Sequence, residues 1–502
     1  MQKRQILNNS IMSVVQIIAI GVTLFLLYRF LLTSIGIEQF GIWSLVLALS
    51  SVSQIANLGL SGSIVKFVAK YIARKDSANV SLVIQTAFLS GAVFASIVLI
   101  ISYPLAKWIL GLIIPNESFH HAIAILPHAL FAVWIMLVTS ILQAGIDGHQ
   151  RIDLRSFLLI GGAVFNLVLC FILVPSHGLL GAAYARVAQS FTMLLSSWLL
   201  LKRLLPSLPV IPYKWDKFLF REIVGYSINF QIISISTMCY EPVTKVLLSK
   251  FGGVSLVGYF EMATRLVQQF RAIIVSANQV LVPAIAHLKE KTPEKIQGVY
   301  LTSYQLLFYL SIPLYSMIIL CSPVISELWI GHYEEAFVTF TTLLAIGYFF
   351  NTLAAPAYFS YLGTGELRWN VIGHISIGIL NAVLGFLLGI FSNGTGVIIA
   401  WTISLALGSS LIYLSYHIKQ EIPLSELIPK ASNMILLTCT LSILIAGIIR
   451  YNLAPGLNSI TINIITIFLL SIIVFILLWI HPMRKRLKGW INDELLNKKK
   501  GY

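Results

Sequence analysis

The stretch NLVLCFIL at residues 166–173 returns as NAVLGFLL at residues 381–388, with five of the eight residues identical. Further residues repeat at the same offset of 215 or at a related offset of 217: Gly148 with Gly363, Gly181 with Gly396, Ala185 with Ala400, Gly41 with Gly258, Val65 with Val282, and Ala69 with Ala286. Any one match could arise by chance, but together they predict two consecutive copies of one structural unit.

The composition places both copies in a membrane. The chain has 502 residues, of which 58% are hydrophobic and 11% are charged, and its mean hydropathy is +0.87. A soluble domain would carry about 25% charged residues. The cysteines lie singly in apolar stretches, a pattern that predicts neither a disulfide framework nor a metal site: Cys170, Cys239, Cys321 and Cys439.

Apolar segments long enough to cross a bilayer as helices divide the whole chain. We predict fourteen, at residues 7–32, 40–64, 80–105, 121–145, 155–175, 181–203, 221–248, 257–286, 298–322, 336–361, 370–391, 395–417, 432–450 and 460–481. The prediction is therefore an all-α integral membrane protein with four parts. They are an N-terminal six-helix bundle (1–203), a cytoplasmic connector (204–217), a C-terminal six-helix bundle (218–418), and a final helix pair with a basic tail (419–502).

The distribution of lysine and arginine predicts the orientation. If the N-terminus is cytoplasmic, 26 of the 34 basic residues fall in inner gaps and tails, and only Lys107, Lys250 and Arg450 fall outside. This is the positive-inside pattern, and it puts both termini in the cytoplasm. The net charge of +15 then faces anionic lipid headgroups rather than nucleic acid. The first apolar segment is too long for a cleavable signal sequence, so we expect it to remain as a membrane anchor.

The remaining five basic residues lie inside predicted spans: Arg29, Arg186, Lys245, Arg265 and Arg271. A charge near the bilayer centre costs about 3 kcal/mol or more, so such residues normally face a cavity or a partner. Together with Lys66 at the cytoplasmic end of the second span, they form a predicted ladder of positive charge. Such a ladder suits a phosphate-bearing ligand, because the arginine fork pairs with phosphate oxygens.

Each of these residues also has a purely structural interpretation. Arg29 and Arg186 lie near an interface and can extend their charges to it, and Lys66 can act as a positive-inside anchor. Lys245 and Arg265 each follow a glutamate by four residues, Glu241 and Glu261 respectively, which is the favoured order for an ion pair within one helix. Arg271 has no acid three or four residues away and is the strongest candidate.

A longer stretch, IGIEQFGIWSLVLALSSVSQIANLGLSGSIVKFVAKYIA at residues 35–73, resembles the N-terminal signature of polysaccharide-export proteins and O-antigen flippases. These belong to the multidrug/oligosaccharidyl-lipid/polysaccharide (MOP) exporter superfamily. The matching parts are the GxxxFGIW entry (36–43), NLGL (57–60) and VKFVAK (65–70). The resemblance implies a MATE-like fold in a bacterial inner membrane. It also implies an undecaprenyl-diphosphate-linked oligosaccharide as the cargo, moved outward by alternating access, with membrane lipids and polysaccharide polymerase machinery as partners.

Coupling to an ion is a weaker expectation. Glu241 precedes Pro242, which should kink the seventh span and free backbone carbonyls. Together with Asn381 and Thr402, Glu241 could bind Na⁺ or H⁺ through oxygen ligands, an arrangement similar to the sodium site of lipid II flippases. The alternative is that Glu241 only neutralises Lys245. We expect no other cofactor.

Three functions are compatible with this pattern. The first is a flippase for an O-antigen, capsule or exopolysaccharide unit, and the second is a MATE-type multidrug or cation antiporter. A cavity for cationic drugs would contain acids rather than arginines. The third, a membrane polysaccharide polymerase or ligase, needs a large extramembrane site, whereas the gaps here reach only about a dozen residues. We therefore expect a transporter and no enzyme activity.

Overall fold

A computed structural model of the chain describes residues 3–52, 60–278, 281–453, 459–484 and 486. These residues are almost entirely helical, and this part of the chain contains no β-strand, which confirms the all-α prediction. The α-helices are α1 (Lys3–Ser51), α2 (Leu60–Ala73), α3 (Ser77–Ile113), α4 (Asn116–Gly148), α5 (Ile152–His177), α6 (Leu179–Leu204), α7 (Lys217–Gly252), α8 (Val254–Asn278), α9 (Leu281–Lys291), α10 (Ile296–Ile330), α11 (Glu335–Leu353), α12 (Ala355–Thr364), α13 (Arg368–Lys419), α14 (Asn433–Leu453) and α15 (Ser459–Ile480).

Each of the fourteen predicted segments overlaps one of these helices. α1 contains the first segment and the start of the second, and α13 contains the eleventh and the twelfth. In the described residues, eight helical segments are long and apolar enough to cross a membrane, so the protein is a multi-pass membrane protein. The number of crossings, fourteen, stays a prediction. The described part leaves out residues 53–59 of the signature, the side chain of Cys239 and the basic tail beyond residue 486.

The first pair of repeated turns has matching backbone geometry. Gly36 interrupts α1 with φ 78° and ψ 168°, and Gly253 separates α7 from α8 with φ 84° and ψ 165°. The positions of these two glycines differ by 217, which is one of the two repeat offsets. A positive φ of this size favours glycine, because a Cβ atom would clash with the backbone. The matching dihedral angles support the predicted internal repeat.

A second pair of turns repeats at the other offset, 215. Gly178 ends α5 with φ 55° and ψ −133°, and its counterpart Asn393 divides α13 with φ 50° and ψ −142°. Three residues beyond each turn lies a glycine against the preceding helix. A Cβ on Gly181 would lie 2.3 Å from the Leu173 carbonyl oxygen, and one on Gly396 would lie 2.1 Å from the Leu388 carbonyl oxygen. Both copies therefore use the same tight hairpin.

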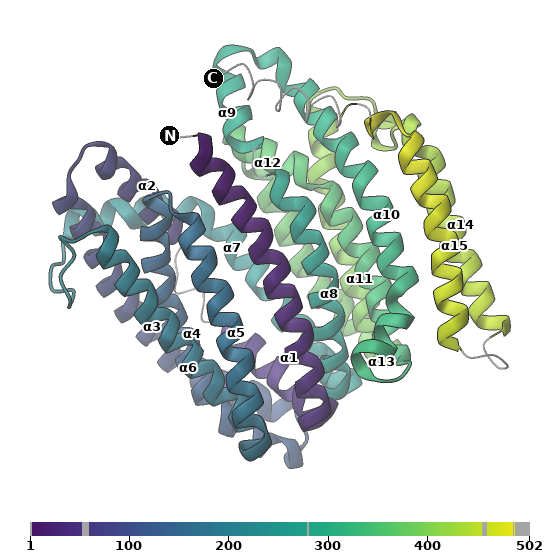
Figure 1. The fold of residues 1–502 in the computed structure, drawn as a ribbon, viewed down its shortest axis with the longest axis horizontal. Helices are drawn as coiled ribbons and strands as arrows, with labels where there is room; N and C mark the ends of the chain where they lie inside the picture. Colours follow the sequence, from purple (N-terminus) through teal and green to yellow (C-terminus); the bar gives the residue numbers. More distant parts are fainter. Residues whose placement is uncertain (1–2, 53–59, 279–280, 454–458, 485, 487–502) are drawn as a thin grey trace. The chain divides into compact units, whose positions relative to one another are not determined.

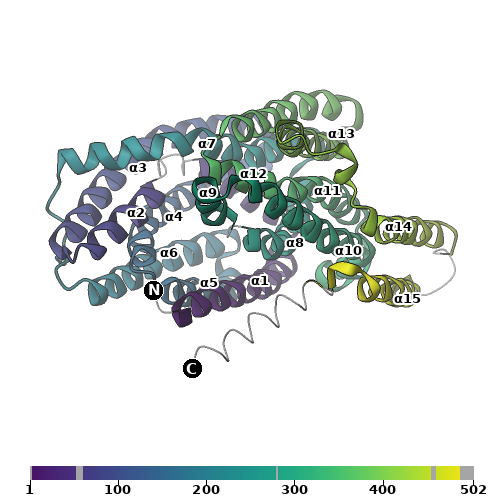
Figure 2. The ribbon, with the colours of Figure 1, turned by 90° about the horizontal axis from the view of Figure 1, so that it is seen from above.

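The chain forms two compact units. The N-terminal unit comprises residues 1–261 and 385–397, and the C-terminal unit comprises residues 262–384 and 398–502. In the N-terminal unit, α5 packs against both α1 and α6 (Figure 2), α4 packs against α6, and α7 contacts α1, α2 and α3. In the C-terminal unit, α14 and α15 lie side by side (Figure 1), and both contact α10. The four-part division predicted from the sequence stays a prediction.

Two repeated glycines allow a very close helix crossing within the N-terminal unit. A Cβ on Gly41 in α1 would lie 1.9 Å from the carbonyl oxygen of Val254 and 3.3 Å from the amide nitrogen of Gly258, near the start of α8. A Cβ on Gly258 would lie 3.1 Å from the Ile37 carbonyl oxygen. The absence of side chains at both positions lets the two backbones meet, and this contact helps to fix the position of the polar residues described next.

Candidate functional site

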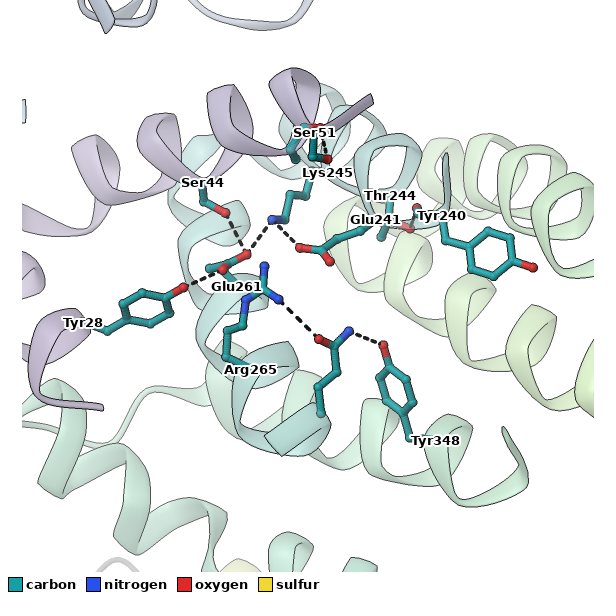
Figure 3. Close-up of polar contacts among 12 residues, drawn as sticks. Tyr28, Ser44, Ser51, Tyr240, Glu241, Thr244, Lys245, Glu261, Arg265 and Tyr348 are labelled. Carbon is teal, nitrogen blue, oxygen red and sulfur yellow. Dashed lines mark hydrogen bonds and ion pairs between the residues drawn. The ribbon is translucent and has the colours of Figure 1, made fainter. Parts of the chain in front are cut away.

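Lys245 is buried between two carboxylates. It lies on α7 one turn after Glu241, and its Nζ atom is 2.7 Å from Glu241 Oε1 and 2.5 Å from Glu261 Oε2 (Figure 3). Lys245 is 1% exposed and Glu261 is 4% exposed, whereas a quarter of the Glu241 side chain is accessible. The helical ion pair expected between Glu241 and Lys245 is present, and Glu261 adds a second, more deeply buried partner.

Two hydroxyl groups also donate hydrogen bonds to Glu261. The Tyr28 hydroxyl donates to Oε1 at 2.7 Å, and the Ser44 hydroxyl donates to Oε2 at 3.1 Å (Figure 3). We call these five residues, Tyr28, Ser44, Glu241, Lys245 and Glu261, the lysine–glutamate cluster. With every group ionised, the cluster carries one excess negative charge. Charge-assisted hydrogen bonds of this kind offset the cost of removing the Glu261 carboxylate from water.

The cluster follows from the repeat. Lys245 and Glu261 lie eight residues before and after the turn at Gly253, so they sit at the same depth on the two antiparallel helices. Tyr28 and Ser44 lie eight residues before and after Gly36, and the offset of 217 relates each to its counterpart in the second copy. Two pairs of equivalent positions therefore come together in the cluster. The residues from the first copy have hydroxyl groups, and those from the second copy are charged.

The C-terminal unit holds a second polar cluster, which contains two arginines, a glutamine and a tyrosine. Arg265 Nη1 donates to Gln268 Oε1 at 3.3 Å, and Gln268 Nε2 donates to the Tyr348 hydroxyl at 2.7 Å (Figure 3). Arg271 lies over the Tyr348 ring with its guanidinium carbon 5.8 Å from the ring centroid. We call Arg265, Gln268, Arg271 and Tyr348 the arginine cluster. It links two of the predicted intramembrane cations through one glutamine and one tyrosine.

Arg271 has hydrogen-bonding capacity that its neighbours do not use. Its side chain is half-buried, and its Nε atom is buried without a hydrogen-bond partner among the described residues. No aspartate or glutamate lies three or four residues from Arg271 on α8. A buried guanidinium donor without an acceptor is costly, because water cannot compensate for the missing bond. An anionic oxygen is the acceptor that fits it best.

The other predicted cations have separate surroundings. Arg29 on α1 is exposed. Lys66 on α2 is also exposed and lies 5.6 Å from the centroid of the Phe67 ring. Arg186 on α6 is half-buried, and its Nη1 donates to Gln189 Oε1 at 2.8 Å. The ladder that would connect these residues with the arginine cluster stays a prediction.

The two oxygen donors predicted to assist Glu241 are both buried. Asn381 is fully buried on α13. Thr402, on the second half of α13, is 8% exposed, and its hydroxyl donates to the carbonyl oxygens of Leu343 and Ile398 at 3.0 Å each. Both belong to the C-terminal unit, whereas Glu241 belongs to the N-terminal unit. The predicted three-residue ion site is therefore untested and stays a prediction.

Sequence reasoning missed Tyr28, Ser44, Gln268 and Tyr348, and it considered Glu261 only as a partner of Arg265. Two signals could have identified the cluster around Glu261. One is the equal distance of Lys245 and Glu261 from the Gly253 turn, and the other is the offset of 217 that relates them to Tyr28 and Ser44. No comparable pattern marks Tyr348, because it lies 80 residues from Gln268.

These features define a multi-pass, all-helical membrane transporter fold built from an internal repeat. The fold is similar to that of an inward-facing multidrug resistance MATE family transporter of the MOP superfamily. The TM-score is 0.70, with 16% identity over 81% of this chain and 98% of the other. It is also similar to the lipid II flippase MurJ in an inward closed conformation, with a TM-score of 0.67 and 14% identity over 93% of this chain and 97% of the other.

A third similar structure is a MOP superfamily transporter from Pyrococcus furiosus described by the reversed polarity of its binding pocket. Its TM-score is 0.53, with 17% identity over 81% of this chain and 95% of the other. A search of curated protein sequences gave no significant match. The polysaccharide biosynthesis protein family matches residues 27–339, which is more than half of the chain. The chain therefore belongs to this family.

Proposed function

We propose that this protein is a flippase of the bacterial cytoplasmic membrane, with both termini in the cytoplasm. Its cargo is an isoprenoid diphosphate-linked oligosaccharide, moved from the inner to the outer leaflet by alternating access. The observation that carries the proposal is Arg271, a half-buried arginine with an unused Nε donor and no acid three or four residues away on α8. A diphosphate supplies the anionic oxygens that this guanidinium needs.

The arginine cluster suits a phosphate group better than a cation. Arg265 donates to Gln268, and Arg271 rests on the Tyr348 ring. The planar guanidinium fork allows two parallel hydrogen bonds to one phosphate. Membership of the polysaccharide biosynthesis family and a fold shared with a lipid II flippase support a lipid-linked cargo.

Transport against a gradient needs an energy source, and we propose Na⁺ or H⁺ coupling through Glu241. Glu241 is the accessible carboxylate of the lysine–glutamate cluster, which has two acids and one base. Uptake of one cation would cancel the excess negative charge, and its release would restore it. Asn381 and Thr402 are the proposed additional oxygen donors.

The decisive experiment identifies the lipid that accumulates when the protein is absent. In a strain lacking the gene, we expect an undecaprenyl-diphosphate-linked oligosaccharide to collect on the cytoplasmic side, where a membrane-impermeant glycan-oxidising reagent cannot reach it. Expression of the wild-type chain should restore accessibility at the outer face. Normal accessibility in the deletion strain would contradict the proposal.

A MATE-type cation antiporter is the second candidate, because the lysine–glutamate cluster carries excess negative charge. That function predicts that the deletion strain becomes sensitive to cationic dyes while its lipid-linked glycans remain normal. The two measurements on one strain therefore separate the candidates.

A further inference from the structure

A cavity of about 200 Å³ lies within the N-terminal unit between α4, α5 and α6, and its lining includes no residue of either cluster described above. Its polar lining consists of two carboxamides and three hydroxyls: Gln143, Gln189, Thr139, Ser140 and Ser190. The remaining lining is aliphatic or thioether and includes Leu159, Met136 and Met193. No charged side chain is part of the lining itself, but the Arg186 guanidinium donates to two lining atoms, Gln189 Oε1 and Met136 Sδ.

The polar groups of this cavity are arranged to receive hydrogen bonds from a ligand. The Ser140 hydroxyl donates to the Leu137 carbonyl oxygen at 2.7 Å, and the Ser190 hydroxyl donates to the Arg186 carbonyl oxygen at 2.9 Å. Because each hydroxyl proton is committed to the helix backbone, the oxygen lone pairs remain as acceptors. Ligand hydroxyl groups are the natural donors to them.

The two carboxamides supply the opposite polarity. Arg186 donates to Gln189 Oε1 at 2.8 Å, which fixes the amide and leaves its NH₂ group as the donor. Gln143 makes no hydrogen bond with the described residues, so both ends of its carboxamide are available to a ligand. This lining matches a ligand that both donates and accepts hydrogen bonds and that also has apolar faces.

We infer that the cavity is a subsite for one neutral sugar ring of the transported glycan. Sugar hydroxyls both donate and accept, and the C–H faces of the ring suit Met136, Leu159 and Met193. The volume is below the roughly 300 Å³ of pockets for drug-sized ligands, so it accommodates one ring rather than a disaccharide. An acyl chain would leave the Gln143 carboxamide and the Gln189 NH₂ group without a hydrogen-bond partner, and a cation would find no carboxylate. The inference rests on the proposed function, since the glycan is part of that cargo.

Saturation-transfer NMR on the full-length protein in lipid nanodiscs, free of glycoside detergent, tests the subsite. The probes are D-glucose, D-galactose, L-rhamnose and N-acetyl-D-glucosamine. We expect saturation transfer to at least one sugar, and roughly tenfold weaker binding in Gln143→Leu and in Gln189→Leu, because each loses about one ligand hydrogen bond. Gln297→Leu, a change at an exposed position of α10, is the matched control and should bind normally.

The outcomes separate this inference from the proposed function. No transfer to any probe in the wild type, or undiminished binding in both glutamine variants, would overturn the subsite even if lipid-linked glycan accumulates in the deletion strain. If either leucine variant proves unfolded by circular dichroism, Ser140→Ala replaces it, with the same expected direction and a smaller loss.

Discussion

Lys245 Nζ lies 2.5 Å from Glu261 Oε2, and the two residues come from equivalent depths on either side of one glycine turn. The pair is almost completely buried. Its geometry joins α7 to α8 and, through Tyr28 and Ser44, joins both to the two halves of α1. The stability of the N-terminal unit and the energetics of coupling therefore depend on the same few charges.

Removal of Lys245 should destabilise the protein strongly. In Lys245→Met the carboxylates of Glu241 and Glu261 lose their counter-charge, and breaking a buried pair costs about 3–5 kcal/mol. Thermal unfolding in detergent, followed by circular dichroism, measures the loss. Lys250→Met, at an exposed position of the same helix, is the matched control and should change stability by no more than about 0.5 kcal/mol. Equal melting temperatures for the two variants would show that the pair contributes no stability.

Glu241→Gln distinguishes coupling from simple neutralisation. If Glu241 binds the driving ion, the variant should bind lipid normally but stop responding to a sodium or proton gradient. If it only neutralises Lys245, the variant should keep its response to the gradient, because Glu261 still neutralises Lys245. Transport measured in proteoliposomes with and without an imposed gradient separates the two results. An undiminished response to the gradient in Glu241→Gln would eliminate Glu241 as the ion site.

Arg271→Ala should abolish export of surface glycan while the protein remains at its normal level in the membrane. Arg271→Lys should recover part of the export, because the charge survives but the bidentate fork is lost. Surface glycan is measured by lectin or antibody binding, with protein level checked by immunoblot. Arg221→Ala, at an exposed position near the start of α7, is the control and should export normally. Full export in Arg271→Ala would remove this residue from the site.

The membrane orientation can be tested with reporter fusions. A reporter placed after Lys488 should behave as cytoplasmic, and one placed at Asn452 should behave as external, because the basic residues concentrate in the predicted inner gaps. Paired phosphatase and fluorescent-protein fusions provide the readout. The opposite behaviour at either position would break the predicted orientation.

Gly41→Ala should destabilise the fold although it adds a single methyl group. The new Cβ would lie 1.9 Å from the Val254 carbonyl oxygen, so the backbones of α1 and α8 must separate, at a cost of about 3 kcal/mol. Gly62→Ala on α2 is the control, since a Cβ there meets nothing within 4 Å and alanine favours a helix. A comparison of thermal unfolding in detergent tests both, and equal stability of the two variants would argue against a tight crossing at Gly41.

Helices and turns could be predicted from the sequence, because the length of an apolar segment indicates a helix and the position of a glycine indicates a turn. All fourteen predicted segments overlap helices, and the repeated glycines mark repeated turns. The partners of Glu261 were not predicted, because a search limited to residues three or four positions apart cannot find contacts across a hairpin. Tyr348 was not predicted because its contact with Gln268 depends on how α8 and α11 pack, and apolar periodicity does not encode that packing.

The matched turns at Gly36 and Gly253, and at Gly178 and Asn393, have a consequence for the origin of the chain. Dihedral angles agree closely within each pair, as expected after tandem duplication of one ancestral segment. Tyr28 and Lys245, like Ser44 and Glu261, then descend from single ancestral positions. The first copy now has neutral hydroxyl groups at these two positions, and the second copy has a lysine and a glutamate. The two copies of the repeat have therefore diverged in charge, which allows each copy a separate role.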